Sequence, residues 1–186
     1  MLLNSKIVNK GWKLRPFSLL SVDGNIITDK DLIKSNGLVV AFICNHCPYV
    51  KDIIGRMVND FKELEKLEVG TAAIMPNDAN NYPEDSYDNM IKFSNQHNFN
   101  FHYLYDKDQE IARNYNAVCT PDFFCFDNNK ELFYRGRLDN LKYQSKNEIS
   151  RIKELVNSIK LKIKENMIET LQHSSIGCSI KWKKNI

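Results

Sequence analysis

The sequence contains no long apolar run. No stretch of its 186 residues approaches the roughly 18–20 apolar residues that a membrane-spanning helix needs. Only Met1–Leu3 precede the first polar residues, so the apolar core of a secretory signal peptide is missing. We therefore expect no membrane association and a cytoplasmic location, a compartment in which structural disulfides are uncommon.

The sequence is also poor in glycine and nearly balanced in charge. Its seven glycines form no glycine-rich phosphate loop, so nothing indicates a nucleotide, and we expect no cofactor. The net charge of +3 is too small to indicate a nucleic-acid partner. The part from Leu141 onward carries +6 and residues 1–140 carry −3. Such a basic end fits either an acidic partner or, as is usual for charge runs, a solvated helix face and tail.

Cysteines are few, but two of them form the most informative pattern in the chain. Their total of five is odd, which argues against a disulfide-stapled framework. The apolar run Leu38–Ile43 follows Asn36-Gly37 and predicts a buried strand. It leads into Cys44-Asn45-His46-Cys47 and then Pro48, where a helix is predicted to begin. A C-x-x-C pair at a strand-to-helix junction indicates a thiol–disulfide redox centre.

Hydrophobic periodicity and turn residues predict the elements around this motif. Residues 1–28 form an N-terminal β-hairpin extension that turns at Asp23-Gly24, and Thr28 or Asp29 caps a short helical turn. A long helix follows the motif, because apolar residues recur at helical spacing from 50 to 67. The other predicted elements are a strand at 69–75, a helix ending at 96, an edge strand at 103–104, a helix at 106–115 with Asp108 near its start, a hairpin of 122–126 with 131–135, and a terminal helix from Ile149 to Ile163.

This order of elements predicts an α/β protein. Strand–helix–strand units require parallel pairs joined by right-handed crossovers, while the final hairpin adds antiparallel pairs. A mixed central sheet flanked by helices follows. We assign residues 1–165, including the N-terminal hairpin, to one domain, and residues 166–186 to a C-terminal tail that packs on it or extends from it. In this tail, Ile180 and Trp182 are expected to anchor the chain.

The predicted chemistry depends on forming a thiolate. A free cysteine with a pKa of ~8.5 is mostly protonated at neutral pH. A helix N-terminus, the adjacent His46 and a second thiol would each favour the charged sulfur. Pro48 suits the first helical position, which would place Cys47 near the N-cap and Cys44 earlier in the loop. Cys47 would then have the stronger helix-terminus field.

Motifs spread over most of the chain carry a family resemblance. They are FICNHCPYV at Phe42–Val50, YPEDS at Tyr82–Ser86, LYD at Leu104–Asp106, TPD at Thr120–Asp122, YRGR at Tyr134–Arg137 and GCSIKW at Gly177–Trp182. With them the chain resembles thioredoxin-like redoxins of the alkyl hydroperoxide reductase/thiol-specific antioxidant (AhpC/TSA) superfamily. The resemblance implies the thioredoxin fold and cysteine-based redox activity, and it defines the fold better than the reaction.

The resemblance also implies roles around the cysteine pair. Thr120-Pro121 matches the family's cis-proline loop, which in similar proteins faces the cysteines and pairs with a bound peptide or shields the sulfurs. Cys119 would then lie near the pair. Asn45 and His46 would support it, because a histidine before the second cysteine is similar to strongly oxidising bacterial disulfide enzymes.

The family's peroxidases provide a second interpretation. Their motif P-x-x-x-(T/S)-x-x-C maps the peroxidatic cysteine to Cys47, but Cys44 replaces its Thr or Ser and Val40 replaces its Pro. Arg135 or Arg137 would be the activating arginine. In the usual thioredoxin geometry, by contrast, the first cysteine attacks and the second is shielded. The sequence therefore leaves open which sulfur leads.

Other interpretations of the cysteines are weaker. Both could be buried structural thiols, since free cysteine is often buried. A zinc site would need four ligands, but the chain has only one C-x-x-C pair. Cys119, Cys178 or a histidine would have to complete it, so we expect no metal. Cys178 is either a third redox thiol that docks on the site or an inert residue of the anchored tail. A non-catalytic redox sensor or binding module is the hypothesis from another class.

The sequence thus predicts an enzyme, a thiol–disulfide oxidoreductase that uses Cys44 and Cys47 for dithiol–disulfide exchange. Its expected partners are protein or small-molecule disulfides and thiols. Peroxides are the alternative substrates, with Cys47 peroxidatic, Cys44 resolving and an antioxidant role. No oligomeric state is predicted.

Overall fold

The computed structural model describes residues 1–6, 11–145 and 148–184. Residues 7–10 of the predicted N-terminal extension, Lys146 of the basic part and residues 185–186 of the tail lie outside the described residues. Within the described ranges, no helix combines the length and the apolar character needed to cross a membrane.

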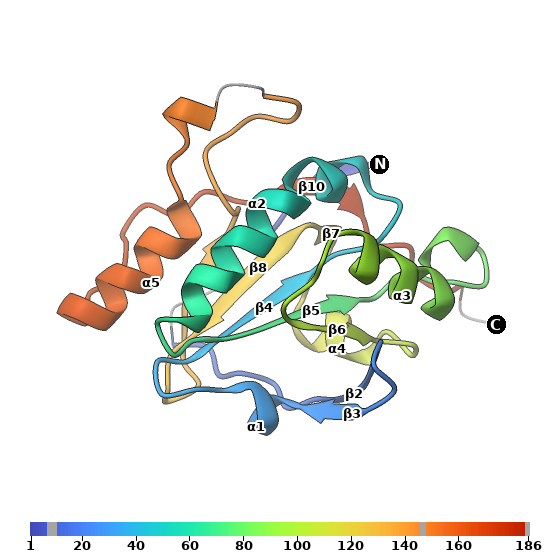
Figure 1. The fold of residues 1–186 in the computed structure, drawn as a ribbon, viewed down its shortest axis with the longest axis horizontal. Coiled ribbons are helices and arrows are strands. Elements are labelled where there is room, and N and C mark those ends of the chain that lie inside the picture. Colours follow the sequence, from blue (N-terminus) through green and yellow to red (C-terminus); the bar gives the residue numbers. More distant parts are fainter. Residues whose placement is uncertain (7–10, 146–147, 185–186) are drawn as a thin grey trace.

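A seven-stranded mixed sheet forms the centre of the molecule (Figure 1). Its strands, in spatial order, are β3 (Ile26–Thr28), β2 (Ser18–Ser21), β6 (His102–Tyr105), β5 (Gly70–Met75), β4 (Leu38–Phe42), β8 (Asp122–Phe126) and β9 (Leu132–Gly136). β5 pairs in parallel with β4 and β6, whereas the other neighbours pair antiparallel. The predicted α/β class and the mixed sheet are confirmed.

Helices cover both faces of this sheet. They are α1 (Asp29–Leu32), α2 (Pro48–Glu65), α3 (Tyr87–Gln96), α4 (Glu110–Asn114) and α5 (Glu154–Glu165), with 3₁₀ turns at Pro83–Asp85 and Glu148–Ser150. Alternate residues of a strand point to opposite faces. Val39 and Ala41 of β4 therefore pack with residues of α2, α3 and α5, whereas Val40 and Phe42 pack with residues of α1 and α4. Two apolar cores sandwich β4, the strand that leads into the cysteine motif.

The N-terminal hairpin continues the central sheet. β2 and β3 pair antiparallel as predicted, and Thr28 caps α1 in a capping box with Asp31. β2 also pairs with β6. The prediction of an edge strand at 103–104 is therefore wrong, because the hairpin covers the edge that this strand would otherwise leave open.

The structure also corrects the helix predicted for 106–115. Gln109 has a left-handed backbone (φ 62°), so α4 begins only at Glu110. Asp106 accepts the amide hydrogens of Ile111 at 3.2 Å and Ala112 at 2.8 Å. Asp106, and not Asp108, is thus the acid that binds the start of this helix.

The terminal helix begins later than the apolar spacing predicts. α5 starts at Glu154, and the side chain of Ile149 is 99% exposed. The amide of Ile152 donates to the side-chain oxygen of Asn140 at 2.7 Å, a bond that a continuous helix would not allow. The Ile149–Ile163 prediction is therefore wrong in its first turn.

A second, three-stranded antiparallel sheet was not predicted. Its strands, in order, are β1 (Leu2–Asn4), β10 (Ile176–Ser179) and β7 (Cys119–Thr120). Beyond β10, Ile180 is 3% exposed and the guanidinium of Arg113 lies 4.4 Å from the ring centroid of Trp182. The tail thus packs on the domain through these two residues, as expected.

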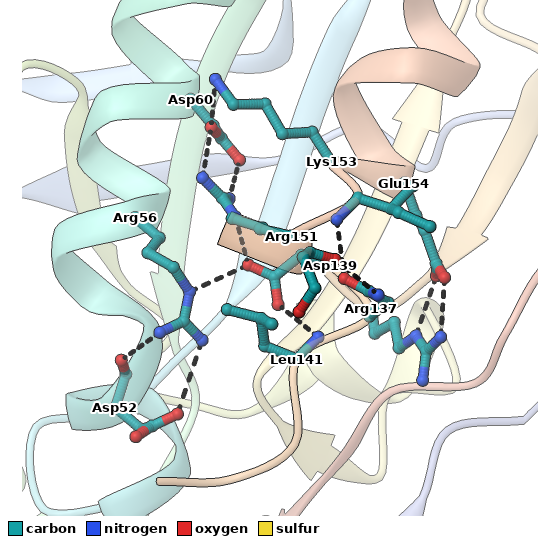
Figure 2. Close-up of polar contacts among 12 residues, drawn as sticks. Asp52, Arg56, Asp60, Arg137, Asp139, Leu141, Arg151, Lys153 and Glu154 are labelled. Carbon is teal, nitrogen blue, oxygen red and sulfur yellow. Dashed lines mark hydrogen bonds and ion pairs between the residues drawn. The ribbon is translucent and has the colours of Figure 1, made fainter. Parts of the chain in front are cut away.

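Ion pairs fix α2 against the segment between β9 and α5 (Figure 2). Arg151 pairs with Asp60 of α2 and with Asp139 at 2.7 Å, and Arg56 of α2 reaches the same Asp139 at 2.9 Å. The side chains of Asp60 and Asp139 are 0% and 2% exposed. Because α2 begins at the cysteine motif, this network holds the helix that carries the motif.

Candidate active site

The cysteine pair lies where β4 ends and α2 begins. Cys47 is the N-cap of α2, with an extended backbone (φ −65°, ψ 120°), and Pro48 is the first helical residue. The placement predicted from Pro48 is confirmed. The amide of Val50, in the first turn of this 18-residue helix, favours the charged form of the Cys47 sulfur. The side chains of Cys44 and Cys47 are both 0% exposed.

The Thr120-Pro121 loop contacts both sulfurs. Its peptide bond is cis, as the resemblance implies. The Cys44 sulfur lies 3.2 Å from the hydroxyl oxygen of Thr120. The Cys47 sulfur lies 3.2 Å from the Thr120 carbonyl oxygen, to which it donates a hydrogen bond while it is protonated. One residue of the loop thus touches each sulfur with a different group.

The two thiols differ in acidity. A hydrogen bond from Cys44 lowers the pKa of Cys47 to about 5 against the effect of burial, and hydrogen bonds from Cys178 and the Val50 amide add to it. The same bond to Cys47, together with burial, raises the pKa of Cys44 well above its ordinary value. At neutral pH the pair therefore carries a thiolate on Cys47 and a thiol on Cys44.

A buried carboxylate from outside the motif organises the loop between the cysteines. One oxygen of Asp85 accepts the amide hydrogens of Asn45 at 2.8 Å and His46 at 3.2 Å. The other oxygen bonds to Nδ1 of His46 at 2.6 Å and to the side-chain amide of Asn77 at 2.8 Å. The bond to Asp85 raises the pKa of His46. Although burial opposes ionisation, the bonds from His46 and Asn77 lower the pKa of Asp85.

Sequence reasoning missed the roles of Asp85 and Asn77. Asp85 belongs to the YPEDS motif that supports the family resemblance, but its spacing of about forty residues from Asn45 gives no signal of contact. Asn77 follows the end of β5 and is 2% exposed. Only the pairing of β4 with β5 brings the segments after these strands together.

β10 brings a third thiol to the pair. In the register of β10 with β7, Cys178 lies opposite Thr120. It packs against the core that contains both motif cysteines, and its thiol is near enough to Cys47 for each to shift the pKa of the other. Burial and the contact with Cys47 raise the pKa of Cys178 to about 11. Cys178 is half-buried, whereas the other four cysteines of the chain are buried.

The other predicted residues lie around the pair: the Cys119 sulfur is 3.9 Å from the carbonyl oxygen of Pro121 in the cis-proline loop, and the two arginines bind carboxylates. Cys119 is buried in β7, and burial raises its pKa. Arg137 pairs with Glu154 at 2.6 Å and Arg135 with Asp122 at 2.8 Å. Both arginines proposed as activating groups are thus committed to carboxylates.

One group of potential metal ligands occurs among the described residues. The ligand atoms of Cys44, His46 and Asp85 lie within 4.8 Å of one another. The Cys44 sulfur already contacts Thr120, and Asp85 holds Nδ1 of His46. Structural zinc takes four ligands, so this hydrogen-bonded set of three does not form such a site.

A cavity of about 310 Å³ lies beside Pro121. Its apolar lining includes Tyr49, Ile53, Pro121, Leu138, Tyr143 and Ile176. The rings of Tyr49 and Tyr143 stack with centroids 4.4 Å apart. The volume is at the lower end of the range for small-ligand sites, about 300–1,000 Å³. The cavity therefore fits an apolar group of modest size next to the cis-proline loop.

The fold, the cysteine pair at a strand-to-helix junction and the facing cis-proline together define a thioredoxin-fold redoxin. The sequence matches the AhpC/TSA family over residues 11–135, and the chain belongs to this family. The family comprises thiol–disulfide oxidoreductases and peroxiredoxin-like proteins, which are generally oxidoreductases. Membership of this family suggests thiol or peroxide substrates.

Two solved structures resemble the chain over almost its full length. An uncharacterized conserved protein from Geobacillus kaustophilus is 37% identical, with a TM-score of 0.94 over 100% of this chain and 98% of its own. A hypothetical protein from Sinorhizobium meliloti 1021 is 30% identical, with a TM-score of 0.92 over 98% and 99%. The thioredoxin domain of a thiol-disulfide oxidoreductase from Bacteroides vulgatus is 11% identical, with a TM-score of 0.64 over 83% and 97%, and shares the fold. No curated protein matches the chain.

Proposed function

We propose that this protein is a thiol–disulfide oxidoreductase in which Cys47 is the attacking thiolate and Cys44 the resolving thiol. The observation that carries the proposal is a pair of sulfurs of unequal acidity, both in contact with Thr120 at a helix start. The thiolate is the nucleophile in disulfide exchange, and Cys47 holds it at neutral pH. Cys44, as its hydrogen-bond donor, is already placed beside the sulfur that it would attack.

The proposed reaction has two steps. The Cys47 thiolate attacks one sulfur of a substrate disulfide, forming a mixed disulfide and releasing a thiolate. Cys44 then loses its proton and attacks the Cys47 sulfur, which forms the Cys44–Cys47 disulfide and releases the second thiolate. The substrate gains the two electrons that the cysteines lose. Once Cys47 is bonded it no longer accepts the proton of Cys44, so the largest cause of the raised Cys44 pKa disappears.

The surrounding residues are proposed to position this pair. Asp85 fixes the Asn45-His46 loop through three hydrogen bonds and is itself held by a fourth from Asn77, and Thr120 contacts both sulfurs. The cavity beside Pro121 would hold the apolar part of a protein or small-molecule disulfide. These groups supply orientation, whereas the sulfurs supply the chemistry.

Single replacements of the pair test the assignment, with oxidised glutathione as the probe. Cys47→Ala should reduce the release of the first glutathione thiol to background, because the nucleophile is gone. Cys44→Ala should still release it, and the adduct should be found on Cys47 by mass spectrometry of quenched samples. Cys125→Ala, which alters a buried cysteine of β8, is the matched control and should behave as wild type. Equal release by all variants would show that the pair does not reduce disulfides.

A peroxidase remains the second candidate, because Cys47 at the N-cap before Pro48 has the position of a peroxidatic cysteine. In that case the Cys44→Ala protein should still form a Cys47 sulfenic acid with hydrogen peroxide, at the wild-type rate once the pH is high enough to ionise Cys47. The pairing of Arg135 and Arg137 with carboxylates favours disulfide exchange instead. Comparing the rates of Cys47 with hydrogen peroxide and with oxidised glutathione distinguishes the two functions.

A further inference from the structure

The two-cysteine reaction leaves Cys178 unused, although this residue packs against the core that contains Cys47 and lies opposite Thr120. β10 lies against α2 and beside β7, so it covers the start of the helix where Cys47 sits (Figure 1). Cys47 is 0% exposed, whereas Cys178 is half-buried. Cys178 is thus the sulfur of the site that solvent reaches.

We propose that Cys178 is a third redox thiol, which forms a disulfide with Cys47 and offers external thiols and disulfides an accessible sulfur. The inference rests on the proposed function, because it takes Cys47 to be the nucleophile. It gives β10 a catalytic role through Cys178, in addition to its role in packing.

The geometry holds Cys178 from both sides. It lies opposite Leu2 of β1 and opposite Thr120 of β7. The following amides continue the same ladders, because Ser179 donates to the Met1 carbonyl at 2.8 Å and Ile180 to the Val118 carbonyl at 2.9 Å. A thiol on the middle strand of a sheet is held more firmly than one on a loose tail. Thr120, which lies opposite Cys178 in the register, is also the residue whose carbonyl oxygen is 3.2 Å from the Cys47 sulfur.

The proposed exchange balances in sulfur bonds and electrons. After Cys47 has formed a mixed disulfide with a substrate sulfur, Cys178 loses its proton and attacks the Cys47 sulfur. The Cys47–Cys178 bond forms, the bond to the substrate breaks, and the substrate leaves as a thiolate that takes up a proton. Cys44 can in turn attack Cys47, which forms the Cys44–Cys47 disulfide and returns Cys178 to a thiol. The second exchange moves the disulfide without net oxidation.

The acidities favour Cys178 as the sulfur that external thiols attack. An external thiolate that attacks Cys178 in the Cys47–Cys178 disulfide expels Cys47, whose pKa of about 5 makes it a good leaving group. A second external thiol then releases Cys178, so two thiols become one disulfide and the protein regains two thiols. Attack on the buried Cys44–Cys47 bond would first require access to a covered sulfur.

Disulfide mapping tests the inference directly. Reduced Cys44→Ala protein is treated with oxidised glutathione, quenched by alkylation, digested and analysed by mass spectrometry. We expect the first adduct on Cys47 to convert into a Cys47–Cys178 disulfide. In Cys44→Ala/Cys178→Ala the adduct on Cys47 should persist, and Cys44→Ala/Cys125→Ala should behave as Cys44→Ala alone. A persistent Cys47 adduct in Cys44→Ala would overturn the inference and leave the proposed function intact.

A rate measurement gives an independent outcome. Oxidised wild type and oxidised Cys178→Ala are each reduced with glutathione, and the loss of disulfide is followed. If Cys178 is the point of attack, its loss should slow reduction on the order of tenfold. Equal rates would show that Cys178 only packs against the site. If Cys47→Ala also forms adducts as fast as wild type, the proposed function itself fails, which separates the two results.

Discussion

At the scale of single residues, the site depends on one acidic thiol. Burial raises the pKa of Cys119 and Cys125, and the pKa of Cys44 is raised as well, so Cys47 is the cysteine expected to titrate in the acidic range. Its pKa of about 5 has the hydrogen bond from Cys44 as its largest cause. Ultraviolet thiolate absorbance against pH should therefore show one transition near this value.

Removing the donor should move that transition. In Cys44→Ala we expect the pKa of Cys47 to rise toward the ordinary ~8.5, and in Cys178→Ala to rise by less. Cys125→Ala is the control and should leave the transition unchanged. A transition that stays near 5 in Cys44→Ala would mean that Cys178 and the helix start are enough to lower the pKa.

The same acidity links stability to pH. A thiol whose pKa is lower in the folded chain contributes stability above its unfolded pKa, and this contribution is lost as pH falls through the folded value. Relative to Cys47→Ser, reduced wild type should thus be most stable above ~8.5 and should lose this advantage as the pH falls to about 5.

How far the site could be predicted from sequence also depends on single residues. Pro48 placed Cys47 at the N-cap correctly, because the preference of proline for the first helical turn is local. Asp85 could not be assigned, since its partners Asn45 and His46 are distant in sequence and meet it only in the folded chain. Local rules therefore identified the sulfurs, but not the carboxylate that orders their loop.

At the scale of secondary-structure elements, β10 depends on a glycine. A Cβ atom at Gly177 would lie 2.0 Å from the carbonyl oxygen of Thr120. Because the obstacle is backbone, the strand itself would have to shift. Gly177→Ala should lower the free energy of unfolding by about 1–3 kcal/mol and should speed the alkylation of Cys47 at fixed pH.

Gly55→Ala provides the matched control for that variant. Gly55 lies on the exposed side of α2, and a Cβ atom there has no neighbour within 4 Å. Alanine should stabilise the helix by about 0.5–1 kcal/mol and leave Cys47 alkylation unchanged. If Gly177→Ala matches this control in urea unfolding and in alkylation, β10 does not shield Cys47.

The strands differ in how well the sequence pattern predicts them. Apolar runs identified β4 and β8, whose side chains are buried on both faces. β10 was missed because its four residues have the burial pattern of a half-exposed strand and its partners lie at residues 2–4 and 119–120. Ile149 led to the opposite error, an α-helix predicted where none forms. Its spacing is helical, but Arg151, two residues later, pairs with Asp60 and Asp139, and α5 begins only at Glu154.

At the scale of the whole molecule, the arginine network joins the two halves of the chain. Arg151→Met would leave the buried carboxylates of Asp60 and Asp139 without their shared partner. Removing one member of a buried pair costs about 3–5 kcal/mol, so urea unfolding should show a loss of that size. The control is Lys13→Met, which breaks the exposed pair with Glu131 (58% and 47% exposed) and should cost about 0–1 kcal/mol. Similar losses in both variants would contradict this role for the network.

The position of β10 along the chain also sets an order in time. Ribosomes build proteins from the N-terminus, so α2 and Cys47 are made before the strand that covers them. With synthesis at about 5–20 residues per second, the segment between Cys47 and Cys178 takes on the order of ten seconds. During that interval the sulfur of the growing chain lacks both its cover and its third thiol. The Cys47 sulfur of a newly made chain is therefore open to oxidants until the last strand is in place.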